Sequence, residues 1–390
     1  MTPAARLSAA IEVLDRILAG AAPEPALTGW GRANRYAGSG DRHAVRDRVY
    51  QALRRRRSAA WVGGAETGRG LVLGLLRLAG EAPETLFTGD RFAPPPLSPG
   101  EAGQPLDSAP DPVRLDVPDW LWPQLSDDLG DDLVPVLEAC QSRAPVWLRV
   151  NRSRASIAEA AASLAAEGIA TRPHDDFDCA LEVIENTRKV SRSIALSEGL
   201  VELQDAASQA VTLSLGDLAG LDVLDYCAGA GGKALHLADL GAKVTAHDVA
   251  PGRMRDLEPR AARAGLSIAR AATAALPGLG PWPLVLVDAP CSGSGTWRRD
   301  PMAKWALTPE RLAELGRVQA EVLDAAAALT APGGRLAFVT CSILSAETRA
   351  PVESFLSRSP GWQSRLRRTF LPGPAGDGFS VEILARAQQA

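Results

Sequence analysis

The sequence lacks the marks of several common protein classes. Its 390 residues include only five cysteines and four histidines, which are scattered, and no Cys-x-x-Cys pair. This spacing argues against a zinc site and against a disulfide framework, so we expect no metal and reduced thiols. No apolar run approaches the roughly 20 residues of a membrane span, and no apolar core follows the first residues as in a signal peptide. We therefore expect a cytoplasmic protein without membrane contact, and we take a monomer as its working state.

A strong charge of one sign is also absent. The chain has 42 Lys and Arg against 46 Asp and Glu, a net charge of -4, which gives no global sign of nucleic-acid binding. The local distribution differs, because residues 41 to about 62 are expected to form a helix with a run of arginines: Arg54, Arg55, Arg56 and Arg57. These arginines cover every side of a helix and follow Trp30 and Tyr36, so we expect contacts with RNA phosphates and bases. A solvated helix face with ordinary salt bridges is the alternative.

Composition divides the chain into four parts. Residues 1–90 read mostly as helix, and residues 91–117, with seven prolines, read as a linker. Residues 118–200 read as a small α/β unit with a strand at residues 146–150, after which Asn151, Arg152 and Arg154 suit either substrate contact or a turn. Residues 201–390 alternate strand and helix signals, which predicts an α/β domain with a parallel sheet.

The first strand of this last part leads into a glycine-rich turn. Residues 221–225 form an apolar strand that ends at Asp225, and residues 226–233 connect it to a helix expected over residues 234–240. A strand, a glycine-rich turn and a helix are typical of a nucleotide-type site, and Asp248, 23 residues after Asp225, suits the ribose hydroxyls. Because an acid precedes the glycines, a cationic cofactor such as S-adenosylmethionine fits better than NAD with its two phosphates.

Two further strands each end in a thiol. Residues 285–287 form an apolar run that leads to Asp288 and Cys291, and the strand at residues 335–340 leads to Cys341. Ligands of parallel sheets bind beyond the carboxyl ends of the strands, so both thiols are expected at one edge. A lone buried cysteine is usually inert, but two beside a predicted cofactor site are not easily explained by packing.

These residues carry a resemblance to a known family. Asp288-Ala289-Pro290-Cys291-Ser292-Gly293, Thr340-Cys341-Ser342 and Asp225-x-Cys227-Ala228-x-x-Gly231-Gly232-Lys233 resemble the motifs of the RNA cytosine-carbon-5 methyltransferases, RsmB/NSUN-type, in their bacterial ribosomal-RNA branch. The likeness covers roughly residues 115–390, and the N-terminal helices are similar, more faintly, to a NusB-like RNA-binding domain. The resemblance implies a class I, Rossmann-like methyltransferase domain, S-adenosylmethionine as cofactor, and ribosomal RNA of the small subunit as substrate.

The resemblance also implies residue roles. Carbon 5 of cytosine is a poor nucleophile until a thiolate adds to carbon 6. In the family that thiol corresponds to Cys341, while Cys291 assists release of the product, Asp288 bonds the cytosine ring, and Lys233 favours the thiolate or orients the base. The expected cofactor contacts are Asp225, Cys227, Ala228, Gly229, Ala230, Gly231, Gly232, Lys233, Asp248, Thr273 and Asp288.

The chain departs from the family pattern at two places. Gly229 and Ala230 replace an Ala-Pro pair, and residues 271–274 carry Thr273 but no acid where the family places one near adenine. A basic segment after the first thiol resembles the substrate-side loop, so RNA contacts are also expected there, with loop packing as the alternative: Arg298, Arg299 and Lys304.

Other functions remain open at this point. A DNA cytosine methyltransferase would use Cys291 and would not need Cys341, and an amino-group methyltransferase would show a different motif at residues 288–291. Transfer RNA is an alternative substrate. A non-catalytic RNA-binding ribosome-assembly factor is an alternative class, supported by the missing acid near Thr273.

Overall fold

The computed structural model describes residues 1–387, which fall into two compact units. Unit 1 contains Met1–Arg143 together with the short segment Trp297–Ala306, and unit 2 contains the other described residues. The predicted linker, residues 91–117, lies within unit 1 and holds one short α-helix, α6 (Asp111–Arg114), and two 3-10 helical turns. The division into four parts that we expected from composition stays a prediction.

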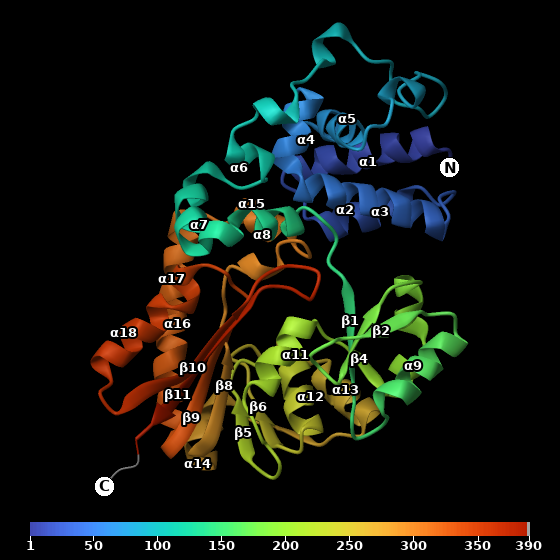
Figure 1. The fold of residues 1–390 in the computed structure, drawn as a ribbon. Coiled ribbons are helices and arrows are strands. Elements are labelled where there is room, and N and C mark those ends of the chain that lie inside the picture. The colour runs from blue at the N-terminus through green and yellow to red at the C-terminus, as the bar shows by residue number, and fades with distance from the viewer. Residues whose placement is uncertain (388–390) are drawn as a thin grey trace. The chain divides into compact units, whose positions relative to one another are not determined.

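Unit 1 is helical (Figure 1). Its helices besides α6 are α1 (Pro3–Leu18), α2 (Pro23–Ala33), α3 (Ser39–Arg54), α4 (Arg56–Gly63), α5 (Gly68–Leu78), α7 (Trp122–Leu129), α8 (Leu133–Cys140) and α15 (Pro301–Ala306). The side chain of Thr2 caps α1, and the helix ends before Gly20, which has a φ of 104°. Helices α4 and α5 pack so closely that a Cβ at Gly74 would lie 1.9 Å from the carbonyl oxygen of Ala59. A core of leucine, valine and alanine side chains from α1 to α5 holds the unit together.

The expected helix over residues 41–62 is interrupted at Arg55. This residue has φ -109° and ψ 35°, so α3 ends before it and α4 begins after it. The arginine run therefore lies at a corner between two helices instead of around one continuous helix.

Unit 2 contains a small antiparallel sheet. Its four strands pair in the order β2-β3-β1-β4, with bounds β1 (Val146–Val150), β2 (Thr171–Pro173), β3 (Ala180–Val183) and β4 (Val201–Leu203). The predicted strand at residues 146–150 is confirmed. Helix α9 (Ile157–Ala166) begins at Ser156, whose hydroxyl accepts from the backbone N–H of Glu159, and packs on this sheet with α10 (Ile194–Ser197).

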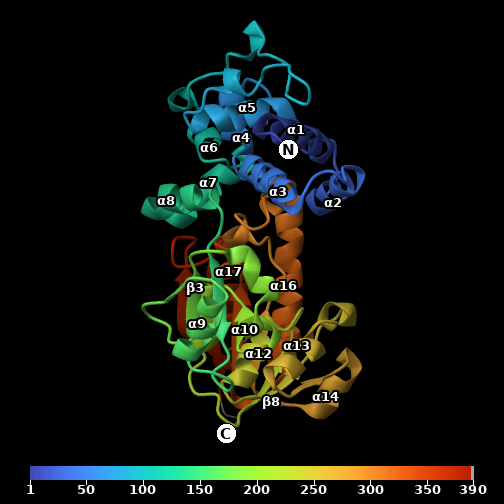
Figure 2. The same ribbon diagram turned by 90° about the vertical axis from the view of Figure 1, so that its right-hand side faces the viewer.

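The larger sheet of unit 2 has seven strands in the order β10-β11-β9-β8-β5-β6-β7 (Figure 1). Figure 2 shows unit 2 after a turn of 90°, with β8 of this sheet labelled. Strands β5 to β9 are parallel, and β10 and β11 add an antiparallel edge. The bounds are β5 (Asp222–Asp225), β6 (Lys243–Ala246), β7 (Ile268–Arg270), β8 (Trp282–Asp288), β9 (Thr330–Thr340), β10 (Trp362–Phe370) and β11 (Phe379–Arg386). This confirms the predicted class I, Rossmann-like α/β architecture.

Helices cover both faces of this sheet. One apolar core joins it to α11 (Ala206–Leu213), α12 (Gly232–Asp239) and α13 (Leu257–Ala264). The other core joins it to α14 (Leu276–Leu279), α16 (Pro309–Leu329) and α18 (Ala350–Arg358), with α17 (Ser345–Thr348) following β9. Because β5, β8 and β9 are covered on both faces, they read as continuous apolar runs in the sequence.

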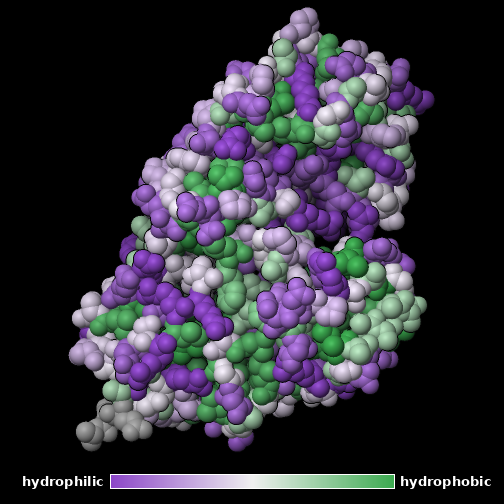
Figure 3. Space-filling model, in the orientation of Figure 1, coloured by the Kyte–Doolittle hydropathy of each residue, from purple (hydrophilic) through white to green (hydrophobic). Residues whose placement is uncertain are grey.

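Several element bounds differ from the sequence predictions. Strand β8 begins at Trp282, and β6 ends at Ala246, so that Asp248 lies two residues beyond its strand. Strand β9 begins at Thr330, five residues before the strand predicted at residues 335–340, and includes Gly333, which has a φ of 73°. None of the helices within residues 1–387 combines the length and apolar composition needed to cross a membrane. On the face shown in Figure 3, hydrophilic side chains are spread among smaller apolar patches.

Candidate active site

Four neighbouring parallel strands end at one edge of the large sheet of unit 2. In the order β9-β8-β5-β6, they end at Thr340, Asp288, Asp225 and Ala246. The loops after these strands carry the residues that we singled out from the sequence, because carboxyl ends of parallel strands share one edge.

The glycine-rich turn after β5 is held by Asp248. One carboxylate oxygen of Asp248 accepts from the backbone N–H of Gly229 at 3.0 Å and pairs with Arg253, and the other accepts from the N–H of Ala250 at 2.9 Å. Asp248 thus already has three donors, and its predicted ribose contact stays a prediction. Gly231 has a φ of 83°, and a Cβ there would lie 2.2 Å from the side chain of Leu257, so this position needs glycine.

Asp225 is a buried acid without a hydrogen-bond partner. It is 1% exposed, and neither carboxylate oxygen has a partner in the protein. Burial, and then the charge of Asp288, raise its pKa to about 7. A buried carboxylate normally has a hydrogen-bond or charge partner, so a cationic ligand group beside Asp225 would supply the partner that the protein itself does not provide. Asp225 and the open turn therefore fit S-adenosylmethionine, whose sulfonium and ammonium are positive.

The stretch without the expected acid is held by a histidine. The Nδ1 atom of His247 lies 2.6 Å from the carbonyl oxygen of Tyr226, and its Nε2 lies 2.8 Å from the hydroxyl of Thr273. Because a carbonyl oxygen only accepts, Nδ1 carries the hydrogen and Nε2 accepts from Thr273. Thr273 is thereby fixed near the ends of β5 and β6, where a ribose or adenine contact was expected.

Lys233 and Asp288 form a partly buried ion pair. The Nζ atom of Lys233 lies 2.7 Å from Oδ2 of Asp288 and 4.9 Å from the ring of Phe379. Burial lowers the pKa of Lys233, but the charge and hydrogen bond of Asp288 outweigh it and leave the pKa raised. Lys233 is therefore a fixed cation next to the thiols, and Asp288, whose side chain is 35% exposed, keeps acceptor capacity for a ligand.

The two strand-end thiols lie together. The Sγ atoms of Cys291 and Cys341 are 3.3 Å apart, and neither cysteine is disulfide-bonded. A hydrogen bond from Cys291 and the charge of Lys233 lower the pKa of Cys341, although burial opposes them. The pKa of Cys291 is raised well above its ordinary value by that same hydrogen bond and by burial. Of the pair, Cys341 is the thiol prepared to ionise, because the hydrogen bond from Cys291 and the charge of Lys233 both lower its pKa.

Cys227, in the glycine-rich turn, is a different kind of thiol. Burial, followed by the charge of Asp225, raises its pKa to about 12, so it stays protonated at neutral pH. It is suited to line a site and not to act as a nucleophile.

The predicted RNA contacts are only partly compatible with the structure. Arg54, Arg298 and Lys304 are buried within unit 1, where Arg54 donates to the carbonyl oxygen of Arg298 and Lys304 to that of Arg54. Burial lowers the pKa of Arg54 to about 10. Burial disfavours contact with an RNA phosphate, and RNA contact by these three residues stays a prediction. The segment Trp297–Ala306, which holds Arg298 and Lys304, packs against α3, and Trp305 donates to the carbonyl oxygen of Leu53 at 2.7 Å.

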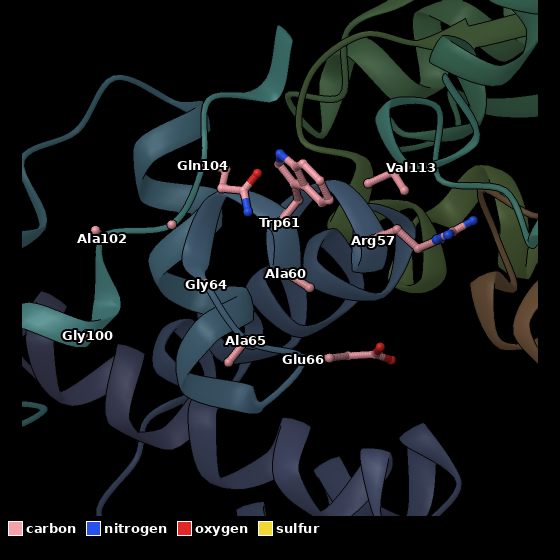
Figure 4. A pocket seen from close by; sticks show the side chains of 11 residues that line it. Arg57, Ala60, Trp61, Gly64, Ala65, Glu66, Gly100, Ala102, Gln104 and Val113 are labelled. Carbon is pink, nitrogen blue, oxygen red and sulfur yellow. The ribbon is translucent and has the colours of Figure 1, made fainter. Parts of the chain in front are cut away.

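The other arginines of the run are half-buried and paired within unit 1. Arg55 donates to Gln141, Arg56 pairs with Glu66, and Arg57 pairs with Asp119. Figure 4 shows Arg57 and Trp61 at a pocket of about 560 Å³ that lies on α4 and the loop before α6. Arg299 is exposed. RNA contact stays a prediction for Arg55, Arg56, Arg57 and Arg299.

Sequence reasoning missed several residues of the site. His247 and Phe379 were not singled out, because their contacts come from elements far apart in the chain. Arg253, which pairs with nearby Asp248, was also missed. Glu347, which is fully buried beneath the two cysteine loops, was also missed. Its only sequence signal is an acid placed six residues after Cys341. Within residues 1–387, no group of three or more His, Cys, Asp or Glu is arranged to hold a metal ion.

The fold and the site define a class of protein: a Rossmann-like domain of the methyltransferase type, with a cysteine pair at the strand ends. Comparison with known families agrees with this class. Residues 212–385 match the model described as 16S rRNA methyltransferase RsmB/F, and residues 117–191 match the ferredoxin-like domain of RsmF/B-like methyltransferases. The chain belongs to the RsmB/F family.

Individual relatives are similar over most of the chain. Ribosomal RNA small subunit methyltransferase B of Vibrio cholerae is 34% identical over 292 residues, 70% of this chain and 66% of the relative. The protein of that name from Salmonella paratyphi B is 33% identical over 282 residues, 67% of this chain and 64% of the relative. The chain thus spans just under two thirds of the length of these relatives.

Solved structures share the fold. PH0851 superposes with a TM-score of 0.76 at 21% identity, over 98% of this chain and 99% of that protein. NSun6 from Pyrococcus horikoshii, solved with SFG, has a TM-score of 0.63 at 16% identity, over 70% of this chain and 99% of that one. At these identities the likeness concerns the fold alone.

Proposed function

We propose that this chain uses S-adenosylmethionine to methylate carbon 5 of a cytosine in RNA, with ribosomal RNA of the small subunit as substrate. The observation that carries this proposal is the thiol pair, with Sγ atoms 3.3 Å apart, beside the Lys233–Asp288 ion pair. A reaction that needed only nucleophilic attack on the base would need only one thiol. Two thiols with opposite pKa shifts suit a reaction that must form a carbon–sulfur bond and later break it.

The residues around the glycine-rich turn would hold the cofactor. Bound S-adenosylmethionine supplies an electrophilic methyl group on a sulfonium. Asp225, buried and without a partner, offers its carboxylate to a positive group. Gly229 and Gly231 have φ values of 51° and 83° and shape the turn, and Thr273 offers a hydroxyl fixed by His247.

The thiols would act in sequence on the cytosine. The Cys341 thiolate adds to carbon 6, and the electron pair of the 5,6 double bond moves to carbon 5, which takes the methyl group. Asp288 bonds the ring and stabilises charge that develops on addition, while Lys233 holds Asp288 and favours the Cys341 thiolate. A water molecule then takes the proton from carbon 5, the electron pair of that bond re-forms the 5,6 double bond, and Cys341 leaves as a thiolate, with Cys291 assisting near carbon 5.

The substrate assignment rests on the relatives. The matched proteins of V. cholerae and S. paratyphi B carry the name ribosomal RNA small subunit methyltransferase B. We infer the same substrate class here, and we place the reaction in the cytoplasm, where thiols stay reduced. The protein would act as a monomer.

The test compares RNA from cells with and without the gene, mapped for 5-methylcytosine by bisulfite sequencing. We expect one ribosomal cytosine mark to disappear and to return with wild type but not with Cys341→Ala. Purified Cys291→Ala should accumulate as a covalent adduct with RNA, visible on a denaturing gel. Cys140→Ala, which removes a buried thiol of unit 1, is the control and should behave as wild type.

Other results would change the assignment. A mark lost from transfer RNA would move the substrate, and an adduct that persists in Cys341→Ala would exchange the roles of the thiols. If no RNA lost a mark while cofactor binding stayed intact, the chain would be a non-catalytic RNA-binding assembly factor.

A further inference from the structure

A buried carboxylate lies beneath the two cysteine loops. Glu347, in α17, has no exposed surface. Its Oε1 accepts from the backbone N–H of Ser292 at 2.7 Å and from the amide of Gln319 at 3.4 Å. Its Oε2 accepts from the hydroxyl of Ser292 at 2.5 Å and from that of Ser342 at 2.6 Å. Four donors meet one side chain, as an ionised carboxylate requires.

The partners of Glu347 connect the two loops. Ser292 directly follows Cys291 after β8, and Ser342 directly follows Cys341 after β9. One carboxylate oxygen therefore bonds the neighbour of each thiol. Without Glu347, the hydroxyls and the N–H would lie buried without their charged acceptor, at a cost that favours movement of the loops.

A second layer of contacts holds Glu347 in place. The amide of Gln319, on α16, also donates to the carbonyl oxygen of Pro290 at 2.8 Å. The hydroxyls of Ser294 and Ser342 lie 2.8 Å apart, and Ser294 accepts from the N–H of Ile343. Every one of these bonds links the loop of one thiol to the other loop or to a helix behind them.

We propose that Glu347 is a positioning residue: by bonding the residues that follow Cys291 and Cys341, it fixes the separation at which the two thiols work on one base. Glu347 touches neither thiol. The catalytic meaning of this role rests on the function proposed above, but the geometric role does not.

The charge of Glu347 has a separate effect. It raises the pKa of both thiols, while Lys233 lowers that of Cys341 and Asp288 raises it. Position and charge are separable with an isosteric change. In Glu347→Gln, the amide oxygen can accept from the backbone N–H of Ser292. The amide nitrogen can donate to the hydroxyls of Ser292 and Ser342, because a hydroxyl can accept as well as donate. Glu347→Ala removes all four bonds.

A trivalent arsenical measures the thiol separation without RNA or cofactor. Phenylarsine oxide forms two As–S bonds to a close thiol pair, and its oxygen leaves as water with the two S–H protons. On the full-length protein, we expect one tight arsenical per chain, abolished by Cys291→Ser or Cys341→Ser. Glu347→Ala should bind it on the order of 100-fold more weakly, because the second thiol no longer has a fixed effective concentration.

The isosteric variant separates positioning from general stability. Glu347→Gln should keep the tight arsenical complex, and its alkylation profile with iodoacetamide should shift to lower pH because a negative charge near the thiols is gone. Glu353→Gln, an exposed glutamate on α18, is the matched control and should change neither readout. Ser342→Ala frees only one loop and should give an intermediate loss, which supplies a result if Glu347→Ala does not fold.

Two results would overturn the positioning role. One is a folded Glu347→Ala or Ser342→Ala protein that binds the arsenical as tightly as wild type. The other is a folded Glu347→Gln protein that loses the complex as fully as Glu347→Ala would. A wild-type protein that shows the expected arsenical pattern but methylates no RNA would contradict only the proposed function and leave the positioning role in place.

Discussion

Replacing Asp225 by asparagine should make the cofactor-free protein more stable at alkaline pH and abolish cofactor binding. Asp225 is buried, lacks a hydrogen-bond partner, and has its pKa raised to about 7 by burial and by Asp288. A raised carboxyl pKa means that the folded state holds the proton more tightly than the unfolded chain. The ionised group therefore costs stability, and the cost grows as the pH rises from the ordinary pKa of 3.8 to about 7.

The size of the effect follows from the shift. Each pKa unit corresponds to about 1.4 kcal/mol, so the cost reaches about 4 kcal/mol above pH 7 and is about 2 kcal/mol at pH 5.5. Water that penetrates the site lowers the cost, which makes these values upper limits. An asparagine amide does not titrate, so the Asp225→Asn protein lacks this pH-dependent cost. The difference in unfolding free energy between Asp225→Asn and wild type should thus increase by up to about 2 kcal/mol between pH 5.5 and pH 8.

Urea unfolding of both proteins at pH 5.5, 7 and 8, without cofactor, measures this difference. Groups shared by the two proteins, such as Lys233 and Asp288, largely cancel in it. Asp222→Asn changes an exposed acid at the other end of β5 and should show no such trend. Calorimetry at pH 8 should find no S-adenosylmethionine binding by Asp225→Asn, because the amide has no charge for the cationic ligand. A stability difference that is constant with pH, or unchanged cofactor affinity, would refute this reasoning.

Two further substitutions test the turn and the lysine. Gly231→Ala should lower the free energy of unfolding by about 1–3 kcal/mol and also lower cofactor affinity, because the position combines a positive φ with a clash against Leu257. Gly232→Ala is the control, since its Cβ would meet nothing within 4 Å, and equal effects of the two changes would contradict the steric reason. Lys233→Met should slow the alkylation of Cys341 by iodoacetamide at pH 8 and move its midpoint to higher pH, because the lysine lowers the pKa of that thiol; an unchanged profile would show that the lysine does not act on the thiol.

The parts of the site that could be predicted are those carried by strand ends. Apolar runs that stop at Asp225, Asp288 and Cys341 indicate buried parallel strands, and the edge rule then brings their last residues together. No contact between side chains had to be known. For the same reason both thiols were expected at one edge, whereas the ion pair of Lys233 with Asp288 was not predicted, because Lys233 lies on a helix and not at a strand end.

Pairings between distant elements could not be predicted in this way. The arginine run reads as a basic surface, but a break at Arg55 turns Arg54 inward, and the segment with Arg298 and Lys304 packs on α3 in unit 1. Charge in a sequence does not reveal whether a side chain is exposed. Glu347 is the opposite case, since an acid in a short helix gives no sign that four buried donors surround it.

The charges at the strand ends fit the proposal of a cationic cofactor and one reactive thiol. Lys233 is the cation that faces Asp225, Asp288 and Cys341 together. Burial, and then the charge of Asp288, raise the pKa of Asp225, and the charge of Lys233 only partly offsets them. A positive ligand at Asp225 would offset the remaining negative charge and leave Lys233 to Asp288 and Cys341. The second thiol, Cys291, has a raised pKa, so in the proposed reaction it stays protonated while Cys341 ionises.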